Sequence, residues 1–184
     1  VDNAWFQGAP GQRDEWRASV RRELGVDENT VVFIYTSKHR EPKRPQDAVE
    51  AFCRLAPDAN ALLLVLGDGV LRRQAEDVFA RAGGRHRVVF RGLVPYGEFP
   101  RYLAGADVLV FPSVENWGMA MNEALGAGLA VLTSDQIAGW MDMVVPGENG
   151  WVFPAGDVAT LSARMAKVIA ERDRIPAMKT ASLA

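Results

Sequence analysis

The 184-residue chain carries 21 Lys and Arg against 23 Asp and Glu, a formal net charge of −2 that excludes a global attraction to nucleic acid or anionic lipid. Its longest apolar run, ALLLVLG at 61–67, is much shorter than the roughly 20 residues of a membrane-spanning helix. Cys53 is the only cysteine, which excludes an intrachain disulfide and a cysteine-based metal site. These features predict one globular domain over residues 1–184, in the cytoplasm.

Short apolar runs alternate with helix-like segments along the chain. Continuous apolar runs without polar alternation are typical of strands that are covered on both faces of a parallel sheet. The alternation therefore predicts an α/β fold of the Rossmann-like type, with a doubly wound parallel sheet between two layers of helices. Strands are predicted at 31–35, 61–67, 87–92, 107–112, 129–134 and 150–154, and helices at 14–24, 45–56, 70–82, 96–105, 118–128 and 157–171.

Residues at the segment boundaries support several of these helices. Pro45 stands where a first helical turn tolerates proline, and Asp157 is placed to cap the last predicted helix. Gly25 and Gly83 follow helical segments, where glycine commonly ends a helix. Beyond the last helix, residues 172–184 lose their periodicity, and we expect them to fray.

Most of the unusual residues occur in four loops that follow predicted strands. In open parallel sheets, ligands bind beyond the carboxyl ends of the strands, where loops lead into helices. The clustering therefore indicates a binding site at that edge of the sheet. The loops are TSKHREPKRP (36–45), GDG (67–69), GLVPYGE (92–98) and SVENWGM (113–119).

The first loop, residues 36–45, gathers five cationic side chains when His39 is included. One interpretation is a solvated basic loop. The other is an anion clamp, in which Lys38 and either Lys43 or Arg44 face a phosphate, and the position after a core strand favours this clamp. The second loop, GDG, is interpreted as a simple turn, because it lacks the third glycine of the dinucleotide-binding fingerprint.

The fourth loop places Glu115 and Glu123 on either side of a helix start. If the helix begins near Gly118, the N–H groups of Gly118, Met119 and Ala120 are free to bind an anion. Glu123 follows on the same helical face, where its two oxygens suit the vicinal hydroxyls of a ribose, and Glu115 suits a second polyhydroxyl group. The alternative is that both glutamates are ordinary solvent-facing residues, and spacing alone leaves this open.

These segments together resemble the C-terminal, nucleotide-sugar-binding half of a GT-B-fold glycosyltransferase of the large retaining family 4. ENWGMAMNE (115–123) matches the E-x7-E motif of that family. The resemblance extends over about residues 28–170, in the order and spacing of the family. It is carried further by SKHREPKRPQDAVEAF (37–52), LLLVLGDG (62–69), VVFRGLVP (88–95), YLAGADVLVFPS (102–113), NEALGAGLAVLTSD (122–135) and GENGWVFPAGD (147–157).

The resemblance implies a role for each matched position. Lys38 and Lys43 would neutralise the diphosphate of a nucleoside diphosphate sugar, Glu115 would bind the transferred sugar, and Glu123 would hold the ribose. Ser37 stands where the family often has glycine, and Lys38 stands where arginine is also common, so the clamp loses a bidentate fork. The other implied donor contacts, mostly by backbone groups, come from Ser37, Leu93, Val94, Gly118, Met119 and Ala120.

The resemblance also implies what lies outside this chain. Residues 1–12 resemble the segment that follows the interdomain linker, and the acceptor-binding N-terminal domain, expected as the partner of this one, is absent. Any membrane association would come from that domain, peripherally at the inner membrane face. The isolated chain is expected to bind nucleotide without catalysing transfer.

Two other functions on the same fold stay open: a non-catalytic nucleotide- or sugar-binding module, and a nucleotide-sugar epimerase. No metal ligands and no cofactor besides the donor are expected, since the chain has no D-x-D motif and its two histidines are isolated.

Overall fold

The structure is a computed structural model and describes residues 2–9 and 11–184; Val1 and Pro10, part of the expected post-linker segment, lie outside the described residues. Within the described chain, six parallel strands form one sheet in the order β3-β2-β1-β4-β5-β6. Every boundary lies within one residue of the predicted strand, and the fold class is confirmed. The strands are β1 (Val31–Thr36), β2 (Ala61–Leu66), β3 (Val88–Gly92), β4 (Val108–Phe111), β5 (Ala130–Ser134) and β6 (Gly150–Phe153).

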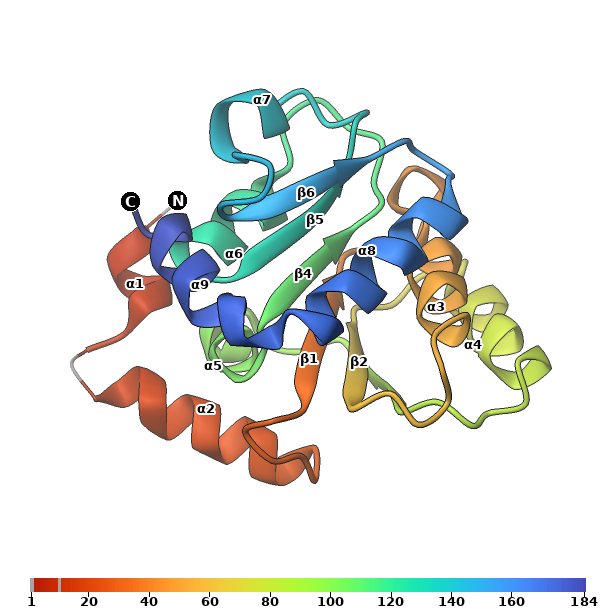
Figure 1. The fold of residues 1–184 in the computed structure, drawn as a ribbon, viewed down its shortest axis with the longest axis horizontal. Coiled ribbons are helices and arrows are strands. Elements are labelled where there is room, and N and C mark those ends of the chain that lie inside the picture. The colour runs from red at the N-terminus through yellow and green to blue at the C-terminus, as the bar shows by residue number, and fades with distance from the viewer. Residues whose placement is uncertain (1, 10) are drawn as a thin grey trace.

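The central strands are apolar at successive positions because they are buried from both sides. In β1, Phe33 and Tyr35 belong to one hydrophobic core, whereas Val32 and Ile34 belong to the other. The first core is closed by α3, α4, α8 and α9, and the second by α1, α2, α5 and α6, which gives the three layers visible in Figure 1. Among the described residues, no helix combines the length and the apolar character that a membrane-spanning segment requires.

The predicted helices are present. α2 begins two residues earlier than predicted, and five of the six predicted helices end one to three residues earlier than predicted, whereas α5 ends where predicted. Three further helices, α1, α7 and α9, were not predicted, and 3-10 turns precede α3, α5 and α9. The helices are α1 (Asn3–Gln7), α2 (Gln12–Glu23), α3 (Pro45–Cys53), α4 (Arg72–Arg81), α5 (Phe99–Gly105), α6 (Met119–Gly126), α7 (Trp140–Met143), α8 (Val158–Ala170) and α9 (Ile175–Ser182), and the turns are η1 (Glu41–Lys43), η2 (Tyr96–Glu98) and η3 (Arg172–Arg174).

The helix-boundary residues have the expected geometry. Pro45 is the first residue of α3, and the Asp157 carboxylate accepts the Thr160 N–H at 2.9 Å, as an N-cap does. Gly25 and Gly83 follow α2 and α4 with φ of 64° and 83°, a conformation that glycine adopts without a steric penalty.

The expectation that residues 172–184 fray is wrong. They form η3 and α9, and α9 buries Ile175 and Met178 against the sheet. The Lys179 ammonium of α9 donates to the Ala106 carbonyl at 3.1 Å. These contacts are with residues distant in sequence, so the local pattern of the tail carried no sign of them.

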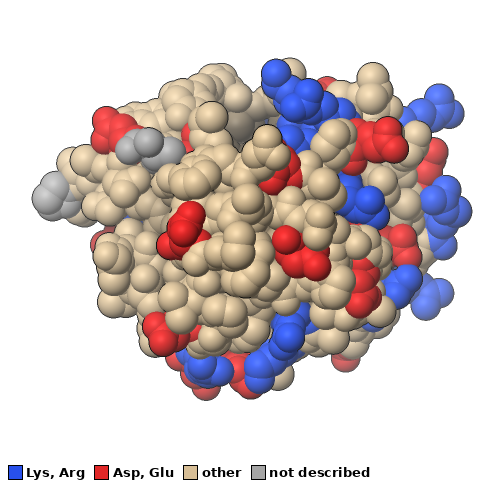
Figure 2. Space-filling model, turned by 90° about the horizontal axis from the view of Figure 1, so that it is seen from above, with Lys and Arg blue, Asp and Glu red and all other residues tan. Residues whose placement is uncertain are grey.

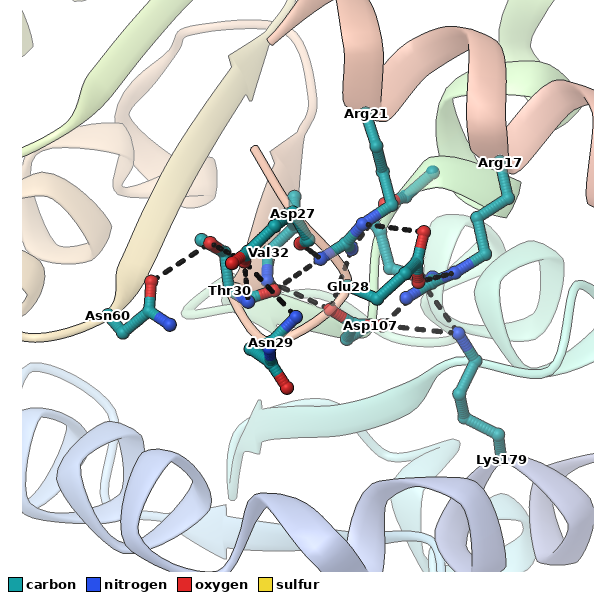
Figure 3. A network of polar contacts seen from close by, with 12 residues as sticks. Arg17, Arg21, Asp27, Glu28, Asn29, Thr30, Val32, Asn60, Asp107 and Lys179 are labelled. Carbon is teal, nitrogen blue, oxygen red and sulfur yellow. Dashed lines mark hydrogen bonds and ion pairs between the residues drawn. The ribbon is translucent and has the colours of Figure 1, made fainter. Parts of the chain in front are cut away.

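At the amino ends of the strands, Asp107 is the centre of an ionic network (Figure 3). Its carboxylate accepts from Arg17 at 3.0 Å, from Arg21 at 3.2 Å and from the Val32 N–H at 2.9 Å, and it pairs with Lys179 at 3.4 Å. The network joins α2, β1, β4 and α9 at the edge of the sheet opposite the predicted site.

Candidate functional site

A cavity of about 440 Å³ opens at the carboxyl ends of β1, β2, β3 and β4. The strand order reverses between β1 and β4, and loops diverge at such a switch point to leave a crevice. The lining residues come from all four of the loops in which unusual residues cluster. They are Thr36, Ser37, Lys38, Arg40, Lys43, Leu66, Gly67, Leu93, Val94, Tyr96, Phe99, Glu115, Met119, Ala120 and Glu123.

Figure 2 shows the side seen from above in Figure 1. On this face many of the Lys and Arg side chains gather toward the right, the region of α3 and α4, further cations lie along the lower edge, and acidic side chains are scattered. The cationic wall of the cavity belongs to this region, since the loop that supplies it leads into α3.

Lys43 is held in place by three contacts. Its ammonium forms an ion pair with Glu115 and lies 5.7 Å from the centre of the Phe111 ring. Its carbonyl accepts the hydroxyl of buried Tyr35 at 3.0 Å. The two predicted side chains therefore meet across the cavity, and the β1–α3 loop is fixed to the core directly behind Lys43.

Not every cation of the basic loop faces the cavity. Lys38, Arg40 and Lys43 line it, whereas the Arg44 guanidinium turns away and donates to Asp47 at 2.6 Å. His39 is buried, with Nε2 3.3 Å from the Leu66 carbonyl, and burial lowers the pKa of its imidazole. His39 therefore does not belong to the cationic wall of the cavity, because its ring is buried and burial disfavours the charged form.

The glycines of the GDG turn, which follows β2, let the basic loop at 36–45 approach that turn closely. A Cβ on Gly67 would lie 1.9 Å from the Ser37 carbonyl oxygen, and one on Gly69 would lie 2.6 Å from that of His39. The Asp68 carbonyl accepts the His39 N–H at 2.9 Å. The turn interpretation is compatible with this geometry, but the turn also positions the segment that carries Lys38.

Replacing Gly67 with alanine is expected to displace Ser37 and Lys38 and to lower the free energy of unfolding by about 1–3 kcal/mol, because Gly67 has a φ of 106° and no space for a Cβ. Chemical denaturation would measure the loss. Gly97→Ala is the matched control, since a Cβ there meets nothing within 4 Å. Equal stability of the two variants would contradict the close approach.

The loop from β4 to α6 is tied to both of its neighbours. The Val114 N–H donates to the Pro42 carbonyl at 2.7 Å, and the Glu115 N–H donates to the Gln136 carbonyl at 3.1 Å. These bonds fix the backbone on both sides of the Glu115 side chain, which is only half-buried and reaches the cavity.

Helix α6 begins at Met119, with Gly118 as its N-cap at a φ of 85°. Met119 and Ala120 line the cavity from the first turn, where backbone N–H groups have no partner within the helix. Gly118 does not line the cavity but lies beneath it, where a Cβ would approach Ile137 at 2.9 Å and Phe111 at 3.1 Å. The predicted helix start is therefore present, with a glycine where nothing larger fits.

Glu123 closes the other end of the cavity and is only 7% exposed. Burial raises the pKa of its carboxyl, while the Tyr96 hydroxyl, which donates to Oε1 at 3.1 Å, acts to lower it. Leu93 and Val94 line the same end. Its burial excludes the interpretation of Glu123 as an ordinary surface residue of the helix.

The structure thus brings the predicted site residues to one cavity, apart from Gly118, which supports it from below. Sequence reasoning missed Tyr96 and Arg40. An aromatic residue in the loop after β3 was the available signal for Tyr96, while Arg40 was not distinguished from its basic neighbours. In the described part of the chain, no group of three or more His, Cys, Asp or Glu side chains could hold a metal ion.

Comparison with known proteins gives a family match over most of the chain. The model of the family described as "Glycosyl transferases group 1" matches residues 17–182. The chain is 32% identical over 142 residues to an uncharacterized glycosyltransferase of Methanocaldococcus jannaschii, covering 76% of this chain and 36% of that protein. It is 35% identical over 172 residues to the 2-deoxystreptamine glucosyltransferase of Streptomyces kanamyceticus, covering 92% of this chain and 43% of that protein.

Among solved structures, the fold is similar to Anabaena Alr3699/HepE, with a TM-score of 0.85 for its complex with UDP and 0.83 for its complex with UDP-glucose. The identity is 20%, and each match covers 100% of this chain and 50% of that one. The chain therefore spans half or less of the length of these relatives.

Proposed function

Because the chain belongs to the glycosyl transferases group 1 family, with 166 of its residues (17–182) matched, we propose that it is the donor-binding half of a retaining glycosyltransferase. The whole enzyme transfers a sugar from a nucleoside diphosphate sugar to an acceptor hydroxyl. The observation that carries the proposal is the single cavity in which both lysines, both glutamates and the start of α6 converge.

The lining residues follow the order of groups in such a donor. The base lies against Leu93 and Val94, and the ribose hydroxyls donate to the Glu123 carboxylate. The diphosphate lies between the lysines of the basic loop and the free amides of Met119 and Ala120. The transferred sugar then reaches Glu115. The UDP-glucose complex of Alr3699/HepE is that protein's own, and through the shared fold it supports a nucleoside diphosphate sugar as the class of ligand.

The reaction requires stabilisation of a departing diphosphate while the sugar becomes oxocarbenium-like. Lys38, Lys43 and the first turn of α6 provide fixed positive potential where the negative charge increases. Glu115 is the counter-ion of Lys43. On donor binding the diphosphate takes over that pairing, and Glu115 becomes free to accept hydroxyl groups of the sugar.

A divalent metal is unnecessary in this mechanism, because side-chain cations and backbone amides neutralise the leaving group. We expect the full-length enzyme to retain its transfer rate in excess EDTA. Radiolabelled sugar transfer with and without EDTA measures this. Loss of transfer that Mg²⁺ or Mn²⁺ restores would contradict the metal-independent mechanism.

The chain alone is expected to bind donor without transferring sugar. The rest of the full-length protein would supply both the acceptor contacts and the exclusion of water. Both glutamates and both lysines line the cavity, which favours an enzyme over a non-catalytic binding module.

A thermal-shift screen of UDP-glucose, GDP-glucose and ADP-glucose tests the proposal. At least one of them is expected to raise the melting temperature of the wild-type chain in a concentration-dependent way, because a ligand that binds the folded state stabilises it by mass action. The same donor should leave Glu123→Ala almost unshifted. If none of the three shifts the wild type, the proposed function is wrong.

A further inference from the structure

Tyr96 closes the end of the cavity at which Glu123 lies. It is the first residue of η2, in the loop that follows β3, and its hydroxyl donates to Glu123 Oε1 at 3.1 Å. Tyr96 is 63% exposed, so water can hydrogen-bond its hydroxyl, and the tyrosine does not need Glu123 as a partner. The contact instead gives a hydrogen-bond partner to Glu123, a residue that is only 7% exposed.

The Tyr96 ring is held from both directions although it is exposed. Its centroid lies 4.9 Å from that of Trp5 in α1 and 6.3 Å from that of Phe99, with which it is stacked. Trp5 in turn packs edge-on against Phe6, which is buried in the core beneath α1. Aromatic pairs at these separations are mutually attractive, so the ring has a defined place that does not depend on the hydrogen bond.

We propose that Tyr96 is a positioning residue for the nucleoside end of the donor: its hydroxyl aims the Glu123 carboxylate at the ribose hydroxyls. The inference rests on the proposed function, in which Glu123 holds the ribose. It adds a residue that acts through Glu123 rather than on the donor itself.

The physical reason is that a buried carboxylate needs a hydrogen-bond donor to stay ionised and oriented. Burial raises the pKa of Glu123, and the Tyr96 hydroxyl opposes this shift. The other charged groups of the cavity are Lys38, Arg40 and Lys43 from the β1–α3 loop and Glu115 from the β4–α6 loop, at the diphosphate end. Among the described residues that line the cavity, Tyr96 is the one whose hydroxyl hydrogen-bonds Glu123, and it thereby acts on the ionisation and direction of that carboxylate.

Tyr96→Phe removes the hydroxyl and keeps the ring between Trp5 and Phe99. The affinity for UDP-glucose would be measured by calorimetric titration at several pH values from 5 to 8. Both phosphates of this ligand stay ionised over that range, so the ligand's own charge does not change. Wild-type affinity is expected to fall with decreasing pH as Glu123 takes up a proton. In Tyr96→Phe the fall should begin at higher pH, and affinity at neutral pH should drop about fivefold.

Discrimination between UDP and 2′-deoxy-UDP gives a second readout. A carboxylate that accepts from both ribose hydroxyls binds a ligand that lacks one of them more weakly. The wild type should therefore bind UDP more tightly than 2′-deoxy-UDP, and the ratio of the two affinities should be smaller in Tyr96→Phe. Tyr102→Phe is the matched control, because Tyr102 is a buried tyrosine in α5 whose hydroxyl accepts from Arg91 at 2.9 Å, away from the cavity lining. It should match the wild type in both readouts.

A double-mutant cycle separates positioning from packing. On a Glu123→Gln background, Tyr96→Phe should change neither the pH profile nor the preference for UDP, since its effect passes through Glu123. Equal titrations of wild type and Tyr96→Phe, or the same loss on both backgrounds, would overturn the inference about Tyr96 and leave the proposed function intact. If the wild-type chain binds none of UDP-glucose, GDP-glucose and ADP-glucose, both the proposed function and this inference are wrong.

Discussion

Replacement of Asp107 with asparagine is expected to lower the free energy of unfolding by about 3–5 kcal/mol. The residue is 5% exposed and holds Arg17, Arg21 and Lys179 around one carboxylate (Figure 3). Asparagine is nearly isosteric but uncharged, so it would leave three partly or fully buried cations facing one another. Asp107 is the buried negative charge that links α2 and α9 at the amino ends of β1 and β4.

The same network determines a pH dependence. Burial alone would raise the pKa of Asp107, but the charges of Lys179, Arg17 and Arg21 and the Val32 N–H hold it below its ordinary value. Burial also lowers the pKa of Lys179 to about 8, although Asp107 opposes the shift. A depressed carboxyl pKa stabilises the fold above the unfolded-state pKa, and this contribution is lost as the pH falls through the folded-state value.

Urea unfolding of wild type and Asp107→Asn at neutral and acidic pH would measure both effects. The difference between the two proteins should shrink as the pH falls below the ordinary range of aspartate, because the wild type then loses its charge as well. Glu28→Gln is the matched control, since Glu28 pairs with Arg17 at 2.9 Å but its side chain is 68% exposed, and its loss should cost at most about 1 kcal/mol. If Asp107→Asn costs no more than Glu28→Gln, the network does not hold these elements together.

The double substitution Lys38→Ala/Lys43→Ala is expected to weaken donor binding at least about a hundredfold. In the proposed function each ammonium makes a charge-assisted contact with the diphosphate, worth about 1.5–3 kcal/mol, and Lys43 is half-buried, so its interaction would be less screened. Transfer by the full-length enzyme should decrease further, because the same cations stabilise the leaving group as its charge grows.

Calorimetry with the donor identified by the screen gives the affinities. Arg44→Ala is the matched control: it removes a cation next to Lys43 in sequence, but its guanidinium is bound to Asp47 and does not line the cavity. Its affinity for donor should stay within about twofold of the wild type. An equal loss in the control and in the double variant would show that general charge, rather than a built phosphate site, attracts the donor.

The fold was predictable because local signals agree with the tertiary structure. The runs VVFIY and ALLLVLG are apolar at every position, as is typical of strands with helices on both faces, and they form the interior strands β1 and β2. The site was predictable for a related reason. Once the strands are parallel, the loops after them meet at one edge, so Lys43, Glu115 and Glu123 converge although they are far apart in sequence.

What escaped prediction depends on contacts that sequence spacing does not encode. The tail after α8 folds because Ile175 and Met178 pack into a hydrophobic core and Lys179 pairs with Asp107. All of these contacts join residues that are far apart in sequence. His39 is buried where the GDG turn packs against its backbone, and burial lowers the pKa of its imidazole. Tyr96 reaches Glu123 only because the loop after β3 and helix α6 border the same cavity.

A crystal structure of the chain with UDP-glucose, or with the donor that the screen selects, tests the central claim most directly. The diphosphate is expected between Lys38, Lys43 and the first turn of α6, with the ribose on Glu123 and the sugar beside Glu115. A donor bound elsewhere on the surface, or one bound in this cavity with its ribose away from Glu123 and its phosphates away from both lysines, would contradict the account.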